Sequence, residues 1–272
     1  MQANHSPDAP IGVFDSGIGG LTVAQALLHQ LPNEQLIYFG DTAHMPYGDK
    51  STAAIQAYSI KIAHMLLQQG CKLILIACNT ASAAAYELVK EYVGSKALVM
   101  NVIDPIVRSL SVNHAEKKIG LIGTRQTVNS HIYKKKVDAL NGHIQLVSHA
   151  TNLLAQAIEE FGPHPIIDQL LKEYLSHDAL QGIDGLVLAC THYPVIKKQI
   201  AAYYDNKIEI IDASLAVAEA VKMQLQKHAL LNESTGVKER RFYLSDYTES
   251  FANNAKLFFS ETLILESYPL WD

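Results

Sequence analysis

Short apolar runs rich in valine, leucine and isoleucine alternate along the chain with longer segments in which apolar residues recur every three or four positions. The short runs predict buried strands, and the longer periodic segments predict amphipathic helices. We expect strands at residues 11–14, 36–39, 73–77, 97–103, 118–122, 144–147, 185–189, 208–211 and 241–244. We expect helices at residues 21–31, 52–69, 81–92, 127–140, 153–161, 166–176, 195–204, 215–227 and 249–259. This regular alternation predicts an α/β protein with parallel sheets and right-handed crossovers.

The second half of this pattern repeats the first at a nearly constant offset. Three pairs of segments carry the repeat, namely 11–17 with 119–124, 77–80 with 189–192, and 102–104 with 210–212. We therefore expect two similar doubly wound parallel-sheet α/β domains related by pseudo-twofold symmetry, with an active site in the cleft between them. The expected division is residues 1–104 plus 213–272 for the first domain and residues 105–212 for the second. The last stretch is too short for a third domain, so we expect it to pack on the first.

Composition excludes several functional classes. The chain has 272 residues and a net charge of -5, without the basic surface that a nucleic-acid partner requires. Its N-terminus has no apolar secretory segment, and no apolar run is long enough to cross a membrane. Its cysteines number only three, which does not indicate a disulfide framework. We expect a cytoplasmic protein.

Two of the three cysteines occupy matched positions. Cys78 and Cys190 each end an apolar run and precede small polar residues that can begin a helix. Ligands of α/β sheets bind at the carboxyl ends of strands, and the positive end of a helix stabilises a thiolate. His192 adds a second source of positive charge beside Cys190. Cys71 precedes a strand without polar neighbours, and we interpret it as a core residue.

Other interpretations of the thiols explain less of the sequence. A redox pair would need a C-x-x-C spacing, and a metal site would need a spaced cluster of ligands; neither is present, so we expect no metal. A single Cys–His nucleophile would account for Cys190 and leave Cys78 unexplained. Two thiols that face one substrate instead suit proton exchange at a single carbon. Without an evident lysine-anchored pyridoxal site, we expect no cofactor.

Two loops supply further polar groups. Asp15 and Ser16 follow the first strand in a glycine-rich turn, but Thr22 stands where a dinucleotide fingerprint needs its third glycine. These glycines could let backbone N–H groups approach a carboxylate, or Asp15 or Ser16 could simply cap the next helix. Tyr47 and Gly48 follow the second strand, where they could contact a ligand or belong to an ordinary packed loop.

Taken together, these motifs resemble those of bacterial glutamate racemases over nearly the whole chain. The matching segments are Phe14–Thr22, Tyr38–Thr42, Pro46–Gly48, Ala77–Ser82, Gly123–Thr124, Thr127–Ser130 and Leu188–Pro194. The resemblance implies cofactor-independent interconversion of L- and D-glutamate, which supplies D-glutamate for peptidoglycan. It implies Cys78 and Cys190 as acid/base residues on opposite faces of the substrate, with assistance from Asp15, His192 and Glu159.

The resemblance also implies a set of substrate contacts and partners. The implied contacts are Asp15, Ser16, Tyr47, Gly48, Asn79, Thr80, Thr191 and His192, with Thr124 and Thr127 as weaker candidates. Glutamate is the implied ligand, a homodimer is the implied assembly, and a peptidoglycan precursor is a candidate effector. The chain departs from the family pattern at Asp104–Ile106, Ala150–Asn152 and Ser245–Asp246, which leaves the cysteine motifs intact.

Two other functions remain open at this point. An aspartate racemase, or a related cofactor-free isomerase or decarboxylase, would use the same scaffold and the same thiols. A non-catalytic two-lobed protein that binds acidic amino acids would use the cleft without using the thiols.

Overall fold

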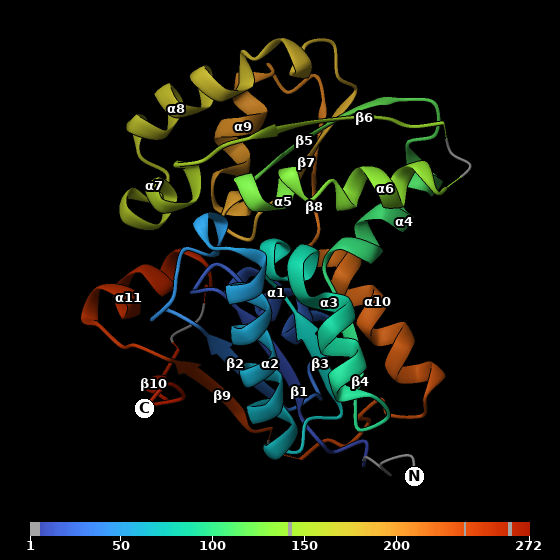
Figure 1. Cartoon of the computed structure of the whole chain (residues 1–272), viewed down its shortest axis with the longest axis vertical. Helices are drawn as coiled ribbons and strands as arrows, with labels where there is room; N and C mark the ends of the chain where they lie inside the picture. The colour runs from blue at the N-terminus through green and yellow to red at the C-terminus, as the bar shows by residue number, and fades with distance from the viewer. Residues whose placement is uncertain (1–5, 141–142, 237, 261–262) are drawn as a thin grey trace.

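Two parallel β-sheets form the framework of the protein. The computed structural model describes residues 6–140, 143–236, 238–260 and 263–272. The first sheet has the order β10-β9-β2-β1-β3-β4, and the second has the order β6-β5-β7-β8. All neighbouring strands within both sheets are parallel. Figure 1 shows the second sheet and its helices above the first, which confirms the expected pair of parallel α/β domains.

The elements follow the order that the hydrophobic pattern predicts. The strands are β1 (Ile11–Asp15), β2 (Leu36–Gly40), β3 (Leu73–Ile76), β4 (Leu98–Asn101), β5 (Lys118–Gly123), β6 (Gln145–Ala150), β7 (Gly185–Ala189), β8 (Glu209–Asp212), β9 (Arg240–Leu244) and β10 (Leu265–Ser267). The α-helices are α1 (Leu21–Gln30), α2 (Thr52–Gln68), α3 (Asn79–Val93), α4 (Ile103–Asn113), α5 (Arg125–Asn129), α6 (Ile132–Asp138), α7 (Leu154–Phe161), α8 (Pro165–Leu175), α9 (Lys197–Tyr203), α10 (Ser214–Lys227) and α11 (Glu249–Asn254). Short 3₁₀ helices lie at Tyr47–Asp49, Asp178–Leu180, Tyr193–Ile196 and Ala255–Leu257.

The first sheet is buried on both faces. Successive side chains of a strand point to opposite faces, so Val13 and Phe14 of β1 belong to different clusters of core residues. Val13 packs in the cluster that includes α1, α4 and α10, whereas Phe14 packs with α2 and α3. Because helices cover both faces of this sheet, a site can form at the strand ends and in the loops that follow them.

The expected repeat is visible in the strand order. Within the first sheet the order β2-β1-β3-β4 corresponds strand for strand to β6-β5-β7-β8 in the second. β9 and β10 extend the first sheet beyond β2, which supports packing of the C-terminal stretch on the first domain. The division into residues 1–104 plus 213–272 and residues 105–212 stays a prediction that this strand membership supports.

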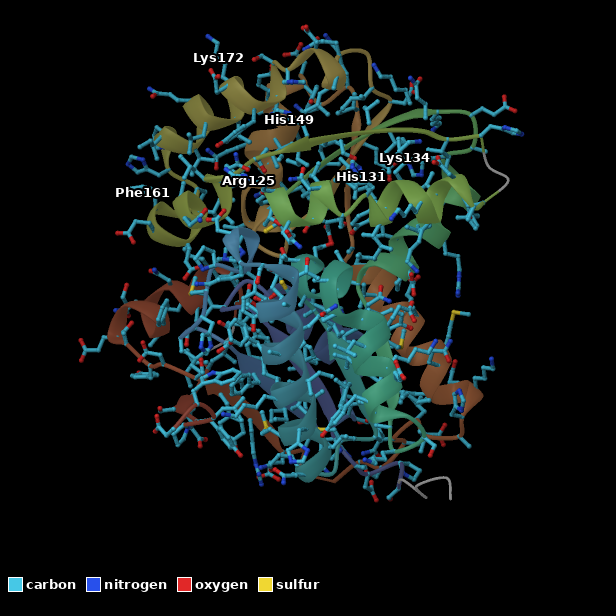
Figure 2. The ribbon with its side chains drawn as sticks, in the orientation of Figure 1. Arg125, His131, Lys134, His149, Phe161 and Lys172 are labelled. Atoms are coloured by element: carbon cyan, nitrogen blue, oxygen red, sulfur yellow. The ribbon has the colours of Figure 1, made fainter. Side chains whose placement is uncertain are left out.

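Three local features differ from the sequence expectations. The segment after β4, for which the sequence predicted no helix or strand beyond residue 103, forms α4, with Pro105 in its first turn, where a missing N–H costs no helical hydrogen bond. The helix expected over residues 127–140 is divided into α5 and α6 by His131, whose φ of 54° is left-handed; Figure 2 labels this residue between the two helices. The sequence analysis also missed β10, which is only three residues long.

Among the residues that the structure describes, no helix combines the length and apolar character needed to span a membrane.

Candidate active site

A cavity lies between the two domains at the carboxyl ends of their strands. The space between its lining atoms is about 440 Å³, part of which is open to solvent. Residues of both domains line it: Ser16, Met45, Pro46, Tyr47, Gly48, Cys78, Asn79, Thr80, Thr124, Ala155, Gln156, Glu159, Cys190, Thr191 and His192. Both predicted thiols therefore face one cavity, although they are far apart in the sequence.

Cys78 follows β3 and is the N-cap residue of α3. Its sulfur accepts a hydrogen bond from the backbone N–H of Ala81 at 3.4 Å, and its thiol lies 3.7 Å from the Ser16 hydroxyl. Burial and, to a smaller extent, the nearby carboxylate of Asp15 raise the pKa of Cys78 to about 12, against the opposing effect of the Ala81 N–H and Ser16. This raised pKa favours the thiol form of Cys78 at neutral pH, the form that can donate a proton.

Cys190 has a different set of neighbours. Its sulfur lies 3.7 Å from Nδ1 of His192, and Nε2 of the same ring lies 2.8 Å from a carboxylate oxygen of Glu159. Burial disfavours the protonated form of His192, whereas the hydrogen bonds from the His192 ring to Cys190 and Glu159 favour it. The hydrogen bonds outweigh burial, so the pKa of His192 is well above its usual value. A positively charged imidazole at this position stabilises negative charge on the Cys190 sulfur.

The two cysteines also begin different kinds of helix, which corrects one sequence expectation. Cys78 caps the full-length helix α3, as predicted. Cys190 and Thr191 are instead followed by a 3₁₀ helix, Tyr193–Ile196, and α9 begins only at Lys197. Pro194 lacks a backbone N–H and lies within this short helix. The charge beside Cys190 thus comes mainly from a side chain, and the charge beside Cys78 comes partly from a helix terminus.

Asp15 lies next to the cavity without lining it. Its carboxylate is fully buried and accepts hydrogen bonds from the Gly17 backbone N–H at 3.0 Å and from the Thr191 hydroxyl at 3.3 Å. Burial raises the pKa of Asp15, and the charge of His192 partly opposes that shift. The structure therefore supports a role for Asp15 beside the thiols more directly than a role in substrate contact, and both roles stay predictions.

The glycine-rich turn after β1 serves a contact that the sequence did not reveal. A Cβ atom built on Gly19 would lie 2.5 Å from Nδ1 of His192 and 2.7 Å from the Thr191 hydroxyl. Only glycine allows the first domain to approach the second domain so closely at this point. The turn therefore packs against the Cys190 side of the site instead of forming a dinucleotide site.

Polar groups on the remaining walls are held by neighbours from both domains. The hydroxyl of Thr80 on α3 lies 2.9 Å from that of Thr124, which caps α5, and 3.3 Å from that of Thr127. The Tyr133 hydroxyl donates to the side-chain oxygen of Asn79 at 2.6 Å. These bonds connect the start of α3 to the second domain and orient Asn79 and Thr80 at the cavity wall.

Some lining residues could not be identified from the sequence. Met45, Ala155 and Gln156 line the cavity but are residue types without distinctive chemistry. Their positions beside Pro46 and Glu159, both in segments already noted, are the only signal that could have indicated them. No group of three or more histidine, cysteine, aspartate or glutamate side chains is arranged to hold a metal ion within the described part of the chain.

The fold and the site together define the class of this protein. Two parallel α/β domains enclose a pair of thiols in one cavity between them. The sequence profile of the Asp/Glu/Hydantoin racemase family matches residues 11–221. The chain therefore belongs to this racemase family, as the motifs indicated.

Individual relatives agree with the family assignment. Glutamate racemase of Chlorobaculum parvum is 39% identical over 256 residues, which cover 94% of each chain. That of Syntrophus aciditrophicus is 39% identical over 264 residues, which cover 97% of each chain. A crystal structure of glutamate racemase from Francisella tularensis in complex with D-glutamate superposes with a TM-score of 0.89 at 39% identity, covering 97% of this chain and 99% of that one.

Proposed function

We propose that this chain interconverts L- and D-glutamate without a cofactor, using Cys78 and Cys190 as its two acid/base groups. The observation that carries the proposal is that both thiols line a single cavity between the two domains. The similar proteins described above are named glutamate racemases, and one of them is described in complex with D-glutamate. The role in supplying D-glutamate for peptidoglycan is proposed on the same basis.

The proposed reaction is a proton exchange across the substrate carbon. Starting from L-glutamate, the thiolate of Cys190 removes the Cα proton while the thiol of Cys78 supplies a proton to the opposite face. The product leaves Cys190 as a thiol and Cys78 as a thiolate, which is the starting state for D-glutamate. His192 and Glu159 stabilise the first charge state, and Ser16 and the N-terminus of α3 stabilise the second.

The intermediate carries negative charge that the protein must stabilise without an electron sink. Asn79 and Thr80 are the first residues of α3, where backbone N–H groups have no acceptor within the helix. Together with Thr191 across the cavity, they are the proposed contacts for the α-carboxylate, on which charge grows in the transition state. Ser16, Tyr47 and Gly48 are proposed for the rest of the substrate.

A stereochemical assay tests this proposal directly. Purified protein incubated with L-glutamate alone should drive the circular dichroism signal of the amino acid toward zero, the value of the racemic mixture. The same assay with L-aspartate separates glutamate racemase from aspartate racemase, the main alternative. Glutamate binding without any loss of optical rotation would instead indicate a non-catalytic binding protein and would overturn the proposal.

Three broader features stay predictions. We propose a cytoplasmic location. We also propose a homodimer, which sedimentation of the purified protein can test. A peptidoglycan precursor is proposed as an effector, and addition of a UDP-linked muramoyl amino acid to the assay tests for activation.

A further inference from the structure

Asp41 lies at the end of β2 and gathers four hydrogen-bond donors. It is fully buried, and its backbone N–H donates to the carbonyl of Asp15 at 3.0 Å. One carboxylate oxygen accepts from the Ser245 hydroxyl at 2.9 Å and from the indole N–H of Trp271 at 2.7 Å. The other carboxylate oxygen accepts from the Tyr47 hydroxyl at 2.6 Å. Nδ1 of His44 lies 3.1 Å from each of the two carboxylate oxygens. An ionised carboxylate accepts about four hydrogen bonds, so this set is complete.

These donors come from three segments that are distant in sequence. His44 and Tyr47 belong to the loop of residues 41–48, which we call the substrate loop because Tyr47 and Gly48 line the cavity. Ser245 immediately follows β9, and its hydroxyl also accepts from the Ala43 N–H at 3.0 Å. Trp271 is the penultimate residue of the chain. Asp41 therefore ties the C-terminus to a wall of the proposed active site.

The C-terminal tail, residues 268–272, reaches this position through contacts of its own. The Tyr268 N–H donates to the carbonyl of Leu244 at 2.9 Å, which continues the path of the chain beyond β10. The Trp271 ring lies nearly perpendicular to the His44 ring, with 4.4 Å between their centroids, and its centroid lies 5.4 Å from that of Tyr58. Lys61 places its ammonium group 4.7 Å from the centroid of the same ring. The tail thus covers the outer side of the substrate loop.

The hydrogen bond to Asp41 also fixes how Tyr47 can meet a ligand. The single O–H of Tyr47 donates its hydrogen bond to Asp41, so the Tyr47 oxygen can only accept a further hydrogen bond. A displaced Asp41 would free the hydroxyl to rotate and would let Gly48 move with the loop. Substrate affinity should therefore depend on whether the donors that hold Asp41 are present.

We propose that Trp271 is a positioning residue: through its indole N–H bond to Asp41, the C-terminal tail holds the substrate loop in the conformation that binds the amino-acid substrate. The proposal rests on the proposed racemase function for its substrate. Cys78 and Cys190 lie outside the loop, so the tail acts on substrate binding and leaves the proton-transfer groups in place.

Steady-state kinetics of Trp271→Phe test this proposal, because phenylalanine keeps an aromatic ring and removes the N–H donor. We expect KM for glutamate to rise about fivefold or more while kcat changes less than about twofold, since one charge-assisted hydrogen bond is lost away from the reacting atoms. The matched control is Lys61→Met, which removes a contact to the same ring without touching Asp41. Its KM should match that of the unmodified protein.

A second variant keeps the test decisive if Trp271→Phe folds poorly. Ser245→Ala removes another donor to the same carboxylate oxygen and should raise KM in the same direction. A tail that merely stabilises the fold would lower the amount of active protein, and hence kcat, with KM unchanged; that result overturns the proposal. Absence of racemisation by the unmodified protein would overturn the proposed function instead, so the two failures are distinct.

Discussion

At the scale of single residues, the site places two identical functional groups in unequal surroundings. Cys78 is held by the Ala81 N–H and Ser16 near a buried carboxylate, whereas Cys190 faces an imidazole that is paired with Glu159. A two-base exchange needs this inequality, because one sulfur must begin with its proton and the other without. The difference comes from neighbours rather than from the cysteines themselves.

Removal of either thiol should stop racemisation. We expect Cys78→Ala and Cys190→Ala each to lower kcat by at least about 100-fold, the usual contribution of a positioned acid or base. Cys71→Ala is the control, since Cys71 is buried in the core outside the cavity, and it should retain kcat. Circular dichroism of glutamate measures all three rates. Normal racemisation of both enantiomers by either active-site variant would reject the two-base scheme.

Solvent isotope incorporation distinguishes two bases from one. In D₂O, the inverted product should gain deuterium at Cα faster than the remaining starting enantiomer does, because the proton removed at one face is not the one returned at the other. Mass spectrometry after chiral separation follows both pools at early times. Faster exchange into the unreacted enantiomer would indicate a single base.

Glu159 should control the pH range of the Cys190 half-reaction. Its bond to His192 helps to raise the pKa of the imidazole, so the protonated form persists to higher pH than in an isolated histidine. Activity that needs this positive charge is present below the raised pKa and is lost as pH rises through it. Glu159→Gln should therefore move the alkaline limb of the kcat/KM profile with L-glutamate to lower pH. An unchanged limb would remove Glu159 from this role.

The sequence could predict those site residues whose type alone indicates chemistry. Cys78 and Cys190 were identified by their duplicated positions at strand ends, and the structure brings both to one cavity. The placement of Asp15 behind Thr191 depends on how closely the two domains approach, which no local pattern encodes. The network around Asp41 was missed for the same reason, because its donors are brought together only by the folded sheet.

At the scale of elements, most strands and helices follow the hydrophobic pattern, and the exceptions have local causes. α4 was missed because Asp104 and Pro105 suggest a break, yet a proline in the first turn is compatible with a helix. The side-chain oxygen of Asn101 accepts from the N–H groups of Ile103 and Asp104 at 2.8 and 2.9 Å. Asn101 thus supplies the start signal that the sequence analysis did not use.

Loss of this start signal should destabilise α4. We expect Asn101→Ala to lower the free energy of unfolding by about 1–2 kcal/mol, similar to the cost of removing a capping side chain, because two N–H groups at the start of α4 lose their acceptor. Asn113→Ala at the other end of α4 is the control, since its side chain is exposed and donates to the Ser109 hydroxyl. Urea unfolding monitored by circular dichroism compares them; equal midpoints for the two variants would contradict the capping role.

At the scale of the whole molecule, the duplicated sequence predicts the duplicated sheet order, because each half buries the same alternation of strand and helix. The additions to the first sheet were less predictable. β9 pairs with β2 from a distance of some two hundred positions, and β10 is too short to carry a periodic signal. What joins these remote segments is a set of buried polar contacts whose partners only the fold identifies.

One such contact lies at the opposite end of the first sheet from the cavity, where Lys72 and Glu34 form a fully buried ion pair with an N–O distance of 2.5 Å. Lys72 also donates to the carbonyls of Pro7 and Leu230, and Glu34 accepts from the Asn232 N–H. The pair thereby joins the N-terminal segment, the turn before β2 and the segment after α10. Burial lowers the pKa of Lys72, and Glu34 partly restores it.

Breaking this pair should destabilise the protein far more than breaking a surface pair. We expect Lys72→Met to lower the free energy of unfolding by about 3–5 kcal/mol, because it leaves the Glu34 carboxylate buried without its counter-ion. The double variant Lys72→Met with Glu34→Leu should recover part of that loss, since it removes the stranded charge. Lys134→Met, which breaks the exposed pair with Asp138, should change stability by less than about 1 kcal/mol. Urea denaturation provides all the values, and a double variant no more stable than Lys72→Met would show that hydrogen bonding to the chain segments, and not the buried charge, dominates.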